Sequence, residues 1–539
     1  MPSYVQRQSV LIVVATAIAA CTPAAPSAPS AAPANASPTA GPVGGTLVTR
    51  LSGDWASLDP FDPGTTNSNQ VMAAVYDRLV TIENGKVIPY VAASWQQTPT
   101  SLTFKLRTEA TCADGSKVTA SLVADNWKRN LDPKKPSQNA AQFLGPQPYT
   151  ITADDAASTV SIALSQPRGD AIYAFTGGFG SIVCAAGLAN PANLADTPSG
   201  SGAYTVVEAV HGDHITLKSR PEWKWGPSNT TATTAGFPQE LVYKVVTNET
   251  TAANLMVTGA MDVAIVKGQD VTRLRNDKTL TSQKALPYTA DPLQMNEDPA
   301  RMTSDKTVRQ ALSMSVDPAG WNQAMNAGEG VLSTSVVTPN APCFDVSTKN
   351  LVPAPDVNKA RALLTSSGWT ADASGKLSKG GKPLALKILG NTTQGTGPEY
   401  LLEQFTKLGV TATLDMLDFT TFAGKYRTSD FDVTVGNLSF AVPGPIQIVS
   451  YLSGTPPPAG RNFGRIIDPE LERAVAAAQA TTGDEQCKNW ATVQERLLSE
   501  AHVLPLAGQV TSVFARNGFS FSPTANNFLE VYLLRAPAK

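Results

Sequence analysis

Histidine is scarce in this chain of 539 residues, which has only His211, His214 and His502. A histidine-built metal centre or catalytic network needs several such side chains together, so both are disfavoured. Charged residues are also few, at 16% of the chain, and 42 Lys and Arg against 44 Asp and Glu leave a net charge of −2. A chain so balanced lacks the positive field that holds a polyphosphate, and we expect no nucleic-acid partner.

The chain also lacks the common catalytic and nucleotide-binding motifs. Residues 375–382 come nearest to a phosphate-binding loop, but the glycine spacing is off by one and Pro383 stands where Ser or Thr is needed. Gly178-Phe179-Gly180 lacks the third glycine of a dinucleotide fingerprint, and no Gly-x-Ser-x-Gly occurs. The pair His211 and His214 lies between two expected strands and is interpreted as part of a turn. We therefore expect no catalytic residue, cofactor or bound metal.

No apolar run is long enough for a membrane-spanning helix, which needs about 20 residues. The apolar residues 10–20 follow Arg7 and are typical of a signal peptide, assigned here to residues 1–20. The run ends at Ile18-Ala19-Ala20-Cys21, which is similar to a bacterial lipobox with Cys21 as the lipidated residue. Residues 21–43 are rich in Ala, Pro and Ser and predict a tether. The alternative is an ordinary signal peptide with an incidental cysteine.

Four cysteines follow the tether: Cys112, Cys184, Cys343 and Cys487. An even number in an oxidising compartment makes two disulfides plausible, and four cysteines allow three connectivities. The alternative is four buried thiols. The residues alone do not decide among these possibilities.

The sequence after the tether predicts a mixed α/β protein. Apolar residues make up 42% of the chain and are sufficient for a large core, and the 40 Gly and 40 Pro residues indicate many turns. Helical spacing of apolar residues predicts a helix over residues 71–80. Thr119 and Asp468 are good helix N-caps, and Gly259 is a good C-cap. Strand, helix and strand over residues 241–266 predict a βαβ unit. Further helices are expected at residues 307–315, 356–367 and 468–478.

An ordered series of short motifs runs through most of the chain. It resembles the peptide and nickel class of extracellular solute-binding proteins of ABC importers, family 5. Each motif alone is weakly specific, whereas the complete series in order, from about residue 44 to about residue 519, is specific. The series comprises Gly44-Gly45-Thr46-Leu47, Leu58-Asp59-Pro60, residues 75–80, 88–95, 104–107, 113–120, 200–204, 258–263, 308–313 and 356–364, and Gly368-Trp369.

The resemblance implies an α/β, bilobal periplasmic-binding-protein fold of type II, from the large cluster with an extra subdomain on the first lobe. Lobe I would take residues 44–285 and 504–539, with the subdomain at about residues 90–194. Lobe II would take residues 286–503. The hinge candidates are Leu286-Pro287-Tyr288 and Leu504-Pro505-Leu506. Ligand would sit in the cleft between lobes that close by hinge bending.

The ligand-binding residues are also expected by resemblance. Lobe I would contribute the loop after the first strand, with Trp55 stacking on ligand and Asp54 facing a cationic group. Lobe II would contribute a strand and loop near residue 436 and a second segment further on. These lobe II candidates are Asn437, Ser439, Phe440, Asn462 and Phe463.

One departure from the family bears on the ligand. Peptide-binding members carry a carboxylate in this lobe II loop to pair with the ligand's α-ammonium, whereas no Asp or Glu occurs between Asp432 and Asp468 here. A buried ammonium without a partner costs several kcal/mol. The amine would have to pair elsewhere, with Asp54 or Asp418 as candidates, or the ligand has none. We hypothesise that the preferred ligand is more apolar or capped than a free-amine peptide.

The lobe assignment implied by the resemblance also suggests a disulfide pairing. A bridge within a lobe leaves closure free, whereas one across the cleft would lock it. We therefore expect Cys112–Cys184 in the subdomain and Cys343–Cys487 in lobe II.

The function implied is capture of a peptide or peptide-like solute and its delivery to ABC permease and ATPase subunits. The protein would act as a monomer, anchored through its lipid to the outer face of the bacterial cytoplasmic membrane. A sensing or adhesion lipoprotein without a transporter is one alternative, and a hydrolytic enzyme on the same scaffold is a weaker one. Nickel or haem as cargo is disfavoured by the scarcity of histidine.

Overall fold

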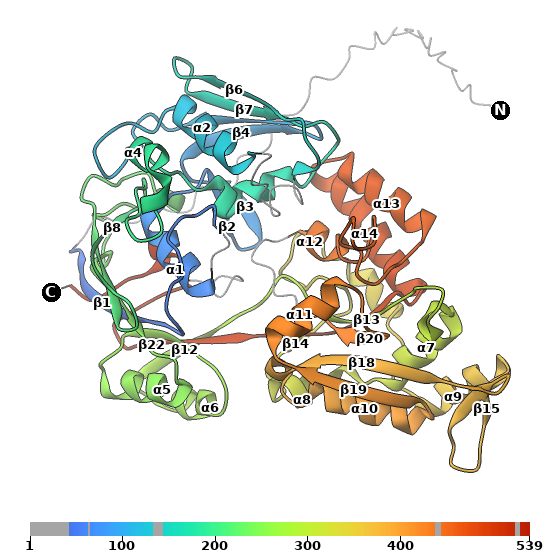
Figure 1. Cartoon of the computed structure of the whole chain (residues 1–539). Helices are drawn as coiled ribbons and strands as arrows, with labels where there is room; N and C mark the ends of the chain where they lie inside the picture. The colour runs from blue at the N-terminus through green and yellow to red at the C-terminus, as the bar shows by residue number, and fades with distance from the viewer. Residues whose placement is uncertain (1–41, 63–64, 133–143, 437–443, 523–528, 539) are drawn as a thin grey trace, which may run out of the picture. The chain divides into compact units, whose positions relative to one another are not determined.

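The computed structural model describes residues 42–62, 65–132, 144–436, 444–522 and 529–538 (Figure 1). Its strands form two large mixed sheets and several small ones. The first large sheet has the central strand β1 in parallel pairing with β10 and β11, while its other pairs are antiparallel. Its strand order is β12 (Leu280–Ala285), β22 (Thr511–Arg516), β11 (Val263–Val266), β1 (Gly44–Leu51), β10 (Pro238–Val245), β9 (His214–Ser219) and β8 (Tyr204–Val210).

The second large sheet is built from the later part of the chain. Parallel pairs join β18 to β19 and β20, and antiparallel pairs join β13 to β20 and β21. Its order is β14 (Val331–Leu332), β21 (Val503–Gly508), β13 (Asp291–Met295), β20 (Val433–Val435), β18 (Ala385–Asn391) and β19 (Thr411–Leu417). We call the elements around the first sheet the first half of the protein and those around the second sheet the second half.

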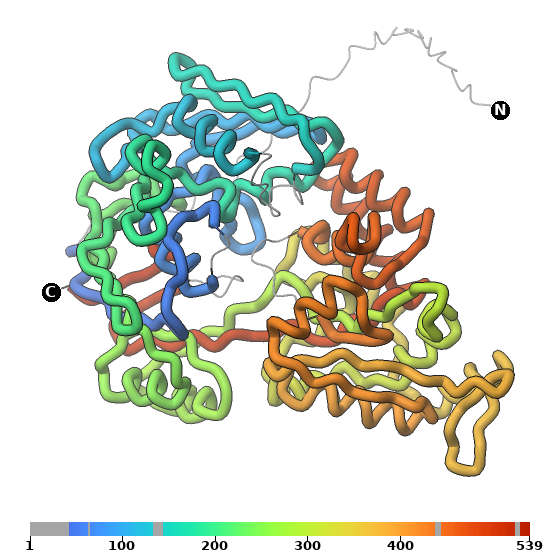
Figure 2. The backbone as a smooth tube through the Cα atoms, in the orientation of Figure 1, coloured from blue at the N-terminus to red at the C-terminus, as the bar shows by residue number. Residues whose placement is uncertain are grey.

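The chain passes between the two sheets twice, at neighbouring positions. Residues 286–290 join β12 to β13, and residues 509 and 510 join β21 to β22. Figure 2 shows these green and red segments running side by side, as expected from the β12–β22 and β13–β21 pairings. The first crossing agrees with the hinge candidate at residues 286–288. The second does not, because Leu504-Pro505-Leu506 lies inside β21, paired with β13, so the crossing comes about five residues later.

The remaining strands form small sheets beside the large ones. A four-stranded antiparallel sheet falls within the expected subdomain, with the order β4 (Ala92–Thr98), β5 (Ser101–Leu106), β7 (Thr159–Ala163) and β6 (Thr150–Asp154). β2 (Val80–Glu83) and β3 (Lys86–Pro89) form a hairpin. A three-stranded sheet combines β15 (Thr370–Ala371), β16 (Leu377–Lys379) and β17 (Lys382–Pro383).

The helices pack around these sheets, and none in the described ranges has the length and apolar character needed to cross a bilayer. In the first half they are α1 (Thr66–Val75), α2 (Ala120–Asn130), α4 (Ala185–Ala189), α5 (Glu249–Thr258) and α6 (Asp270–Arg275). In the second half they are α7 (Lys306–Ser315), α8 (Pro318–Asn326), α9 (Val357–Ser366), α10 (Gly397–Leu408), α11 (Phe419–Arg427), α12 (Pro445–Val449), α13 (Pro469–Gln479) and α14 (Gly483–Ser499).

Local helix signals are confirmed at the positions where they were expected. Thr119 accepts a hydrogen bond from the backbone N–H of Leu122 at the start of α2. Gly259 ends α5 with a φ of 78°, a conformation that glycine adopts without strain. The expected βαβ unit is present as β10, α5 and β11, with β1 inserted between its two strands in the sheet.

The helix expected over residues 71–80 is wrong in its second half. α1 ends at Val75, and the next residues are extended and lead into β2. The buried Asp77 explains the change, because its carboxylate accepts hydrogen bonds from the indole N–H groups of Trp223 at 3.1 Å and Trp225 at 2.7 Å. These long-range bonds outweigh the local helical periodicity.

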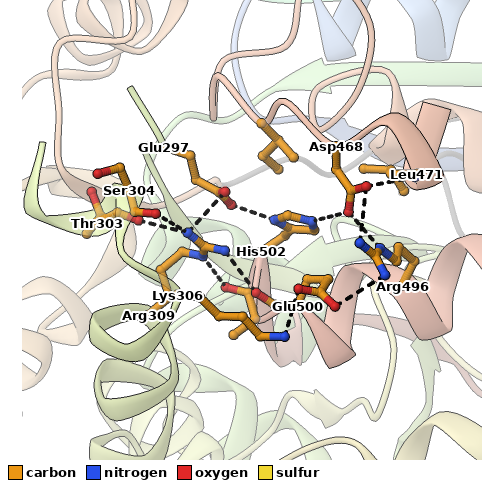
Figure 3. A network of polar contacts seen from close by, with 12 residues as sticks. Glu297, Thr303, Ser304, Lys306, Arg309, Asp468, Leu471, Arg496, Glu500 and His502 are labelled. Carbon is orange, nitrogen blue, oxygen red and sulfur yellow. Dashed lines mark hydrogen bonds and ion pairs between the residues drawn. The ribbon is translucent and has the colours of Figure 1, made fainter. Parts of the chain in front are cut away.

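A cluster of buried charges ties α7, α13 and α14 to the strands of the second half (Figure 3). His502, at the entrance to β21, places Nδ1 2.6 Å from Glu297 Oε1 and Nε2 3.0 Å from Asp468 Oδ2. Arg309 lies 3.1 Å from Glu297, and Arg496 lies 2.7 Å from Asp468. Although burial opposes it, hydrogen bonds from Arg496 and His502 hold the pKa of Asp468 well below its usual range. The cluster therefore combines opposite charges with hydrogen bonds, as buried ions require.

We expect His502→Leu to destabilise the protein, because Glu297 and Asp468 would each lose a buried partner. Removing one member of a buried ion pair costs about 3–5 kcal/mol, and the free energy of unfolding in urea measures the loss. Lys306→Gln is the matched control, since the Lys306–Glu500 pair is partly exposed and worth less than about 1 kcal/mol. Equal losses from the two variants would contradict this assignment.

Candidate functional site

A cavity of about 980 Å³ lies between elements of both halves of the protein. The first half contributes the β2–β3 turn, Gln97 on β4, and Tyr173 in the short helix η1 (Ala171–Thr176). The first crossing contributes Tyr288, and the second half contributes residues 339–343, 482–484, 486 and 487. This volume is within the range of known small-molecule sites. The cavity thus lies between the two halves, where the family resemblance predicts a ligand site.

Two tyrosines give this cavity hydrogen-bonding groups on an apolar wall. Burial raises the pKa of Tyr288 to about 12 and also raises that of Tyr173. Both phenols are therefore neutral at physiological pH and carry an O–H donor. Trp95 adds a third aromatic ring to the lining. Such a surface suits a ligand with both apolar and polar parts.

The charged residues at the cavity balance one another. Glu83 accepts a hydrogen bond from Ser228, and Lys284 lies 2.8 Å from Glu329. Lys86 and Asp484 also line the cavity, and no ion pair engages either of them within the described ranges. Within the described ranges the cavity therefore offers two carboxylates outside any ion pair, Glu83 and Asp484, and one such ammonium group, Lys86.

Two disulfides are present: Cys112–Cys184 in the subdomain and Cys343–Cys487 in the second half. These are the pairings expected from the sequence. Cys343 and Cys487 both line the cavity, so the second bridge joins two of its wall segments, residues 339–343 and 482–487. Neither bridge connects the first half to the second, so neither prevents the halves from moving.

The expected lobe I residues lie outside the described lining of this cavity. Trp55 is buried and stacks on the ring of His211, with centroids 4.4 Å apart. Asp54 Oδ2 accepts a hydrogen bond from the Gly212 backbone N–H and lies 2.9 Å from His211 Nδ1. These contacts tie the loop after β1 to the β8–β9 turn, where His211 was expected, whereas His214 is the first residue of β9 and not part of the turn. A ligand role for Asp54 and Trp55 stays a prediction.

The expected lobe II residues fall into two groups. Asn437, Ser439 and Phe440 lie outside the described residues. Asn462 is fully buried, and its side chain donates to the carbonyls of Gly454 and Ile466 and accepts from the Ile466 N–H. Phe463 packs against Tyr426 and Tyr451. The structure thus gives Asn462 a role within its own loop and Phe463 a role in packing against α11, and their contact with ligand stays a prediction.

Most residues that line the cavity were not predicted as ligand contacts from the sequence. Tyr173 and Asp484 belong to no motif and carry no local signal of their position. Tyr288 was named only as a hinge residue, although an aromatic ring at a hinge beside a cleft is placed to meet ligand.

No group of three or more His, Cys, Asp or Glu side chains in the described ranges is arranged to hold a metal ion.

Comparison with known proteins decides the family. Residues 86–458 match the model of the bacterial extracellular solute-binding proteins, family 5, middle region. The chain belongs to this family. Its members bind solutes for ABC import systems and are not catalysts, and the solutes include peptides, nickel and glutathione.

Individual relatives share the fold at low sequence identity. The periplasmic murein peptide-binding protein MppA of Escherichia coli is 24% identical over 503 residues, which cover 85% of this chain and 87% of the relative. A Microbacterium hydrocarbonoxydans substrate-binding protein, solved with 4-hydroxybenzoate hydrazide, is 26% identical with a TM-score of 0.71, covering 91% of this chain and 99% of that one. Listeria monocytogenes CtaP superposes with a TM-score of 0.76 at 19% identity, covering 92% and 99%.

The hydrogen bonding of Asn462 leads to a test of its role. We expect Asn462→Ala to lower the free energy of unfolding by about 1–3 kcal/mol, since buried backbone groups lose their partners. Asn517→Ala is the control, because this exposed residue makes one surface hydrogen bond and its loss costs within about 0.5 kcal/mol. Unchanged stability in Asn462→Ala would return this residue to the list of ligand contacts.

Proposed function

We propose that this protein captures a peptide-like or smaller amphipathic solute in the cavity beside Tyr288 and delivers it to an ABC permease. The main support is a cavity of ligand size that is lined by residues of both halves and by the segment 286–290 that joins them. Hinge bending at residues 286–290 and 509–510 would open and close it. The family membership supports the transport role, and the relative MppA is named for murein peptide binding.

We further propose that Cys21 carries the lipid anchor and that the tether holds the binding body outside the membrane. Cys21 lies outside the described residues, so the support is the lipobox-like sequence and the Ala/Pro/Ser-rich composition of residues 21–43. A lipid chain contributes about 0.8 kcal/mol per buried CH₂ to membrane binding. Membrane fractionation of the wild type and Cys21→Ala would test the anchor.

The cavity refines the hypothesis about the ligand. Neither carboxylate suggested as an amine partner lines it: Asp54 contacts His211 and Gly212, and Asp418 caps the start of α11. Two other carboxylates line it: Asp484 is exposed at the beginning of α14, and Glu83 is half-buried and already accepts a hydrogen bond from Ser228. An exposed carboxylate attracts an ammonium weakly, because water screens the charge. A free amine therefore adds little to affinity at this site.

Calorimetry with di- to pentapeptides, each free and N-acetylated, tests this conclusion. We expect acetylation to change the dissociation constant by less than about tenfold, which corresponds to 1.4 kcal/mol. Asp484→Asn should have an equally small effect, with Glu485→Gln in the next position as its control. Tight binding of free peptides that acetylation abolishes would refute the hypothesis.

The location of the ligand site can be tested without knowing the ligand. Native mass spectrometry of the purified protein should reveal a bound small molecule. We expect Lys86→Trp to reduce its occupancy at least about tenfold, because an indole at this exposed β3 position would occupy the cavity. Lys218→Trp, on the exposed face of β9 and away from the cavity lining, is the control. Equal occupancy in both variants would place the ligand elsewhere.

A further inference from the structure

The antiparallel helices α13 and α14 form a hairpin whose base belongs to the second half of the protein. Asp468 begins α13 and Arg496 lies in the last turn of α14, and both join the charge cluster around His502 (Figure 3). Through His502 the cluster reaches Glu297, after β13, and through Glu297 it reaches Arg309 on α7. The base of the hairpin is therefore held by several buried ion pairs.

The tip of the same hairpin contacts the subdomain of the first half. The backbone N–H of Gly169 donates to the Gln479 carbonyl at 2.8 Å, and Gln479 Nε2 donates to Asp170 Oδ2 at 3.0 Å. The approach is close enough that a Cβ on Gly169 would lie 1.9 Å from the Thr481 carbonyl oxygen. We call Gly169, Asp170 and Gln479 the latch. The hairpin thus reaches from the charge cluster around His502 to the subdomain of the first half.

The latch lacks one hydrogen-bond donor. Asp170 is 1% exposed, and its ionised carboxylate only accepts hydrogen bonds. The amide oxygen Oε1 of Gln479 is also an acceptor, is buried, and has no donor within the described ranges. A protonated Asp170 would carry an O–H group next to this amide. The arrangement therefore favours the carboxylic acid form of Asp170, since an unpaired buried acceptor costs about 1–3 kcal/mol.

The surroundings of Asp170 favour the same form. Burial raises the pKa of Asp170 to about 7, and the hydrogen bonds from Trp490 and Gln479 and the charge of Arg168 offset this only in part. The other titratable group acting on it from its own segment is Tyr173, which is neutral. The hairpin presents the uncharged Gln479 and Trp490 to it, and β4 presents the uncharged Gln97 to the adjacent Gly169 carbonyl.

We propose that the latch is a pH-sensitive contact between the two halves, closed when Asp170 is protonated and weakened when Asp170 ionises. Opening exposes the carboxyl to water and returns its pKa toward the ordinary value of 3.8. The stabilisation is then complete below pH 3.8 and is lost as the pH rises to about 7. Above that pH the latch is at its weakest.

A latch between the halves would make ligand retention stronger at acidic than at alkaline pH. This consequence for transport rests on the proposed function. The latch itself is measured in ligand-free protein. Its failure and a failure of the proposed function are therefore distinguishable.

Hydrogen exchange with mass spectrometry measures the latch directly, because the Gly169 N–H is one of its bonds. Peptides covering residues 165–175 and 476–486 of the purified protein are compared at about pH 5.5 and about pH 8, with labelling times scaled for intrinsic exchange. We expect protection of the wild type to fall at least about tenfold between these conditions. Equal protection at the two pH values would overturn the proposal.

Three variants distinguish the effect of the latch from a general change in protein stability. Asp170→Asn keeps the shape, supplies a permanent donor and should be protected equally at both pH values. Gly169→Ala should lose protection at both, because its Cβ meets the Thr481 carbonyl. Asp125→Asn, an exposed carboxylate on α2 of the same subdomain, should keep the wild-type pH dependence. A wild-type pH dependence in Asp170→Asn would assign the effect to another group and overturn the proposal.

Discussion

Antiparallel pairing of residues 280–295 with residues 503–516 is the constraint on which the rest of the structure depends. The pairing continues from the first large sheet into the second, so the chain crosses twice at one place. Residues 286–290 and 509–510 join the two sheets, and within the first of these segments Thr289 pairs with Val337. Hinge bending of the kind proposed above would therefore have to pass through these short segments. Tyr288 lies in one of them and also faces the cavity, which couples the hinge to the site.

Much of the fold could be predicted because its signals are local or belong to an ordered motif series. Asp468 caps α13 and Gly259 ends α5 through interactions with their own neighbours in sequence. The end of α1 could not be predicted in this way. Its determinant is the bonding of Asp77 to Trp223 and Trp225, about 150 residues further along the chain. Periodicity describes one face of a segment and says nothing of a distant partner.

The candidate site was less predictable, because residue type does not reveal which hydrogen bonds a side chain already makes. Asn462 has the chemistry of a ligand contact, yet its amide serves the backbone of its own loop. Trp55 has the ring to stack on a solute, yet it stacks on His211. Tyr173 and Asp484 reach the cavity only because the subdomain and the α13–α14 hairpin meet there. Such a meeting is a property of the tertiary structure alone.

The two ends of the α13–α14 hairpin use buried polar groups in opposite ways. At the base, each of the two carboxylates pairs with an arginine, Glu297 with Arg309 and Asp468 with Arg496, so their charges are compensated. At the tip, the carboxyl of Asp170 meets a neutral amide, so its charge is not compensated by its partner in the other half. A buried acid without a cation partner responds to pH by taking up a proton. The base of the hairpin is held by ion pairs, whereas the contact at its tip depends on the protonation of Asp170. The hairpin could therefore detach from the first half while it stays attached to the second. The same helix pair can then serve both as structure for the second half and as a reversible contact with the first.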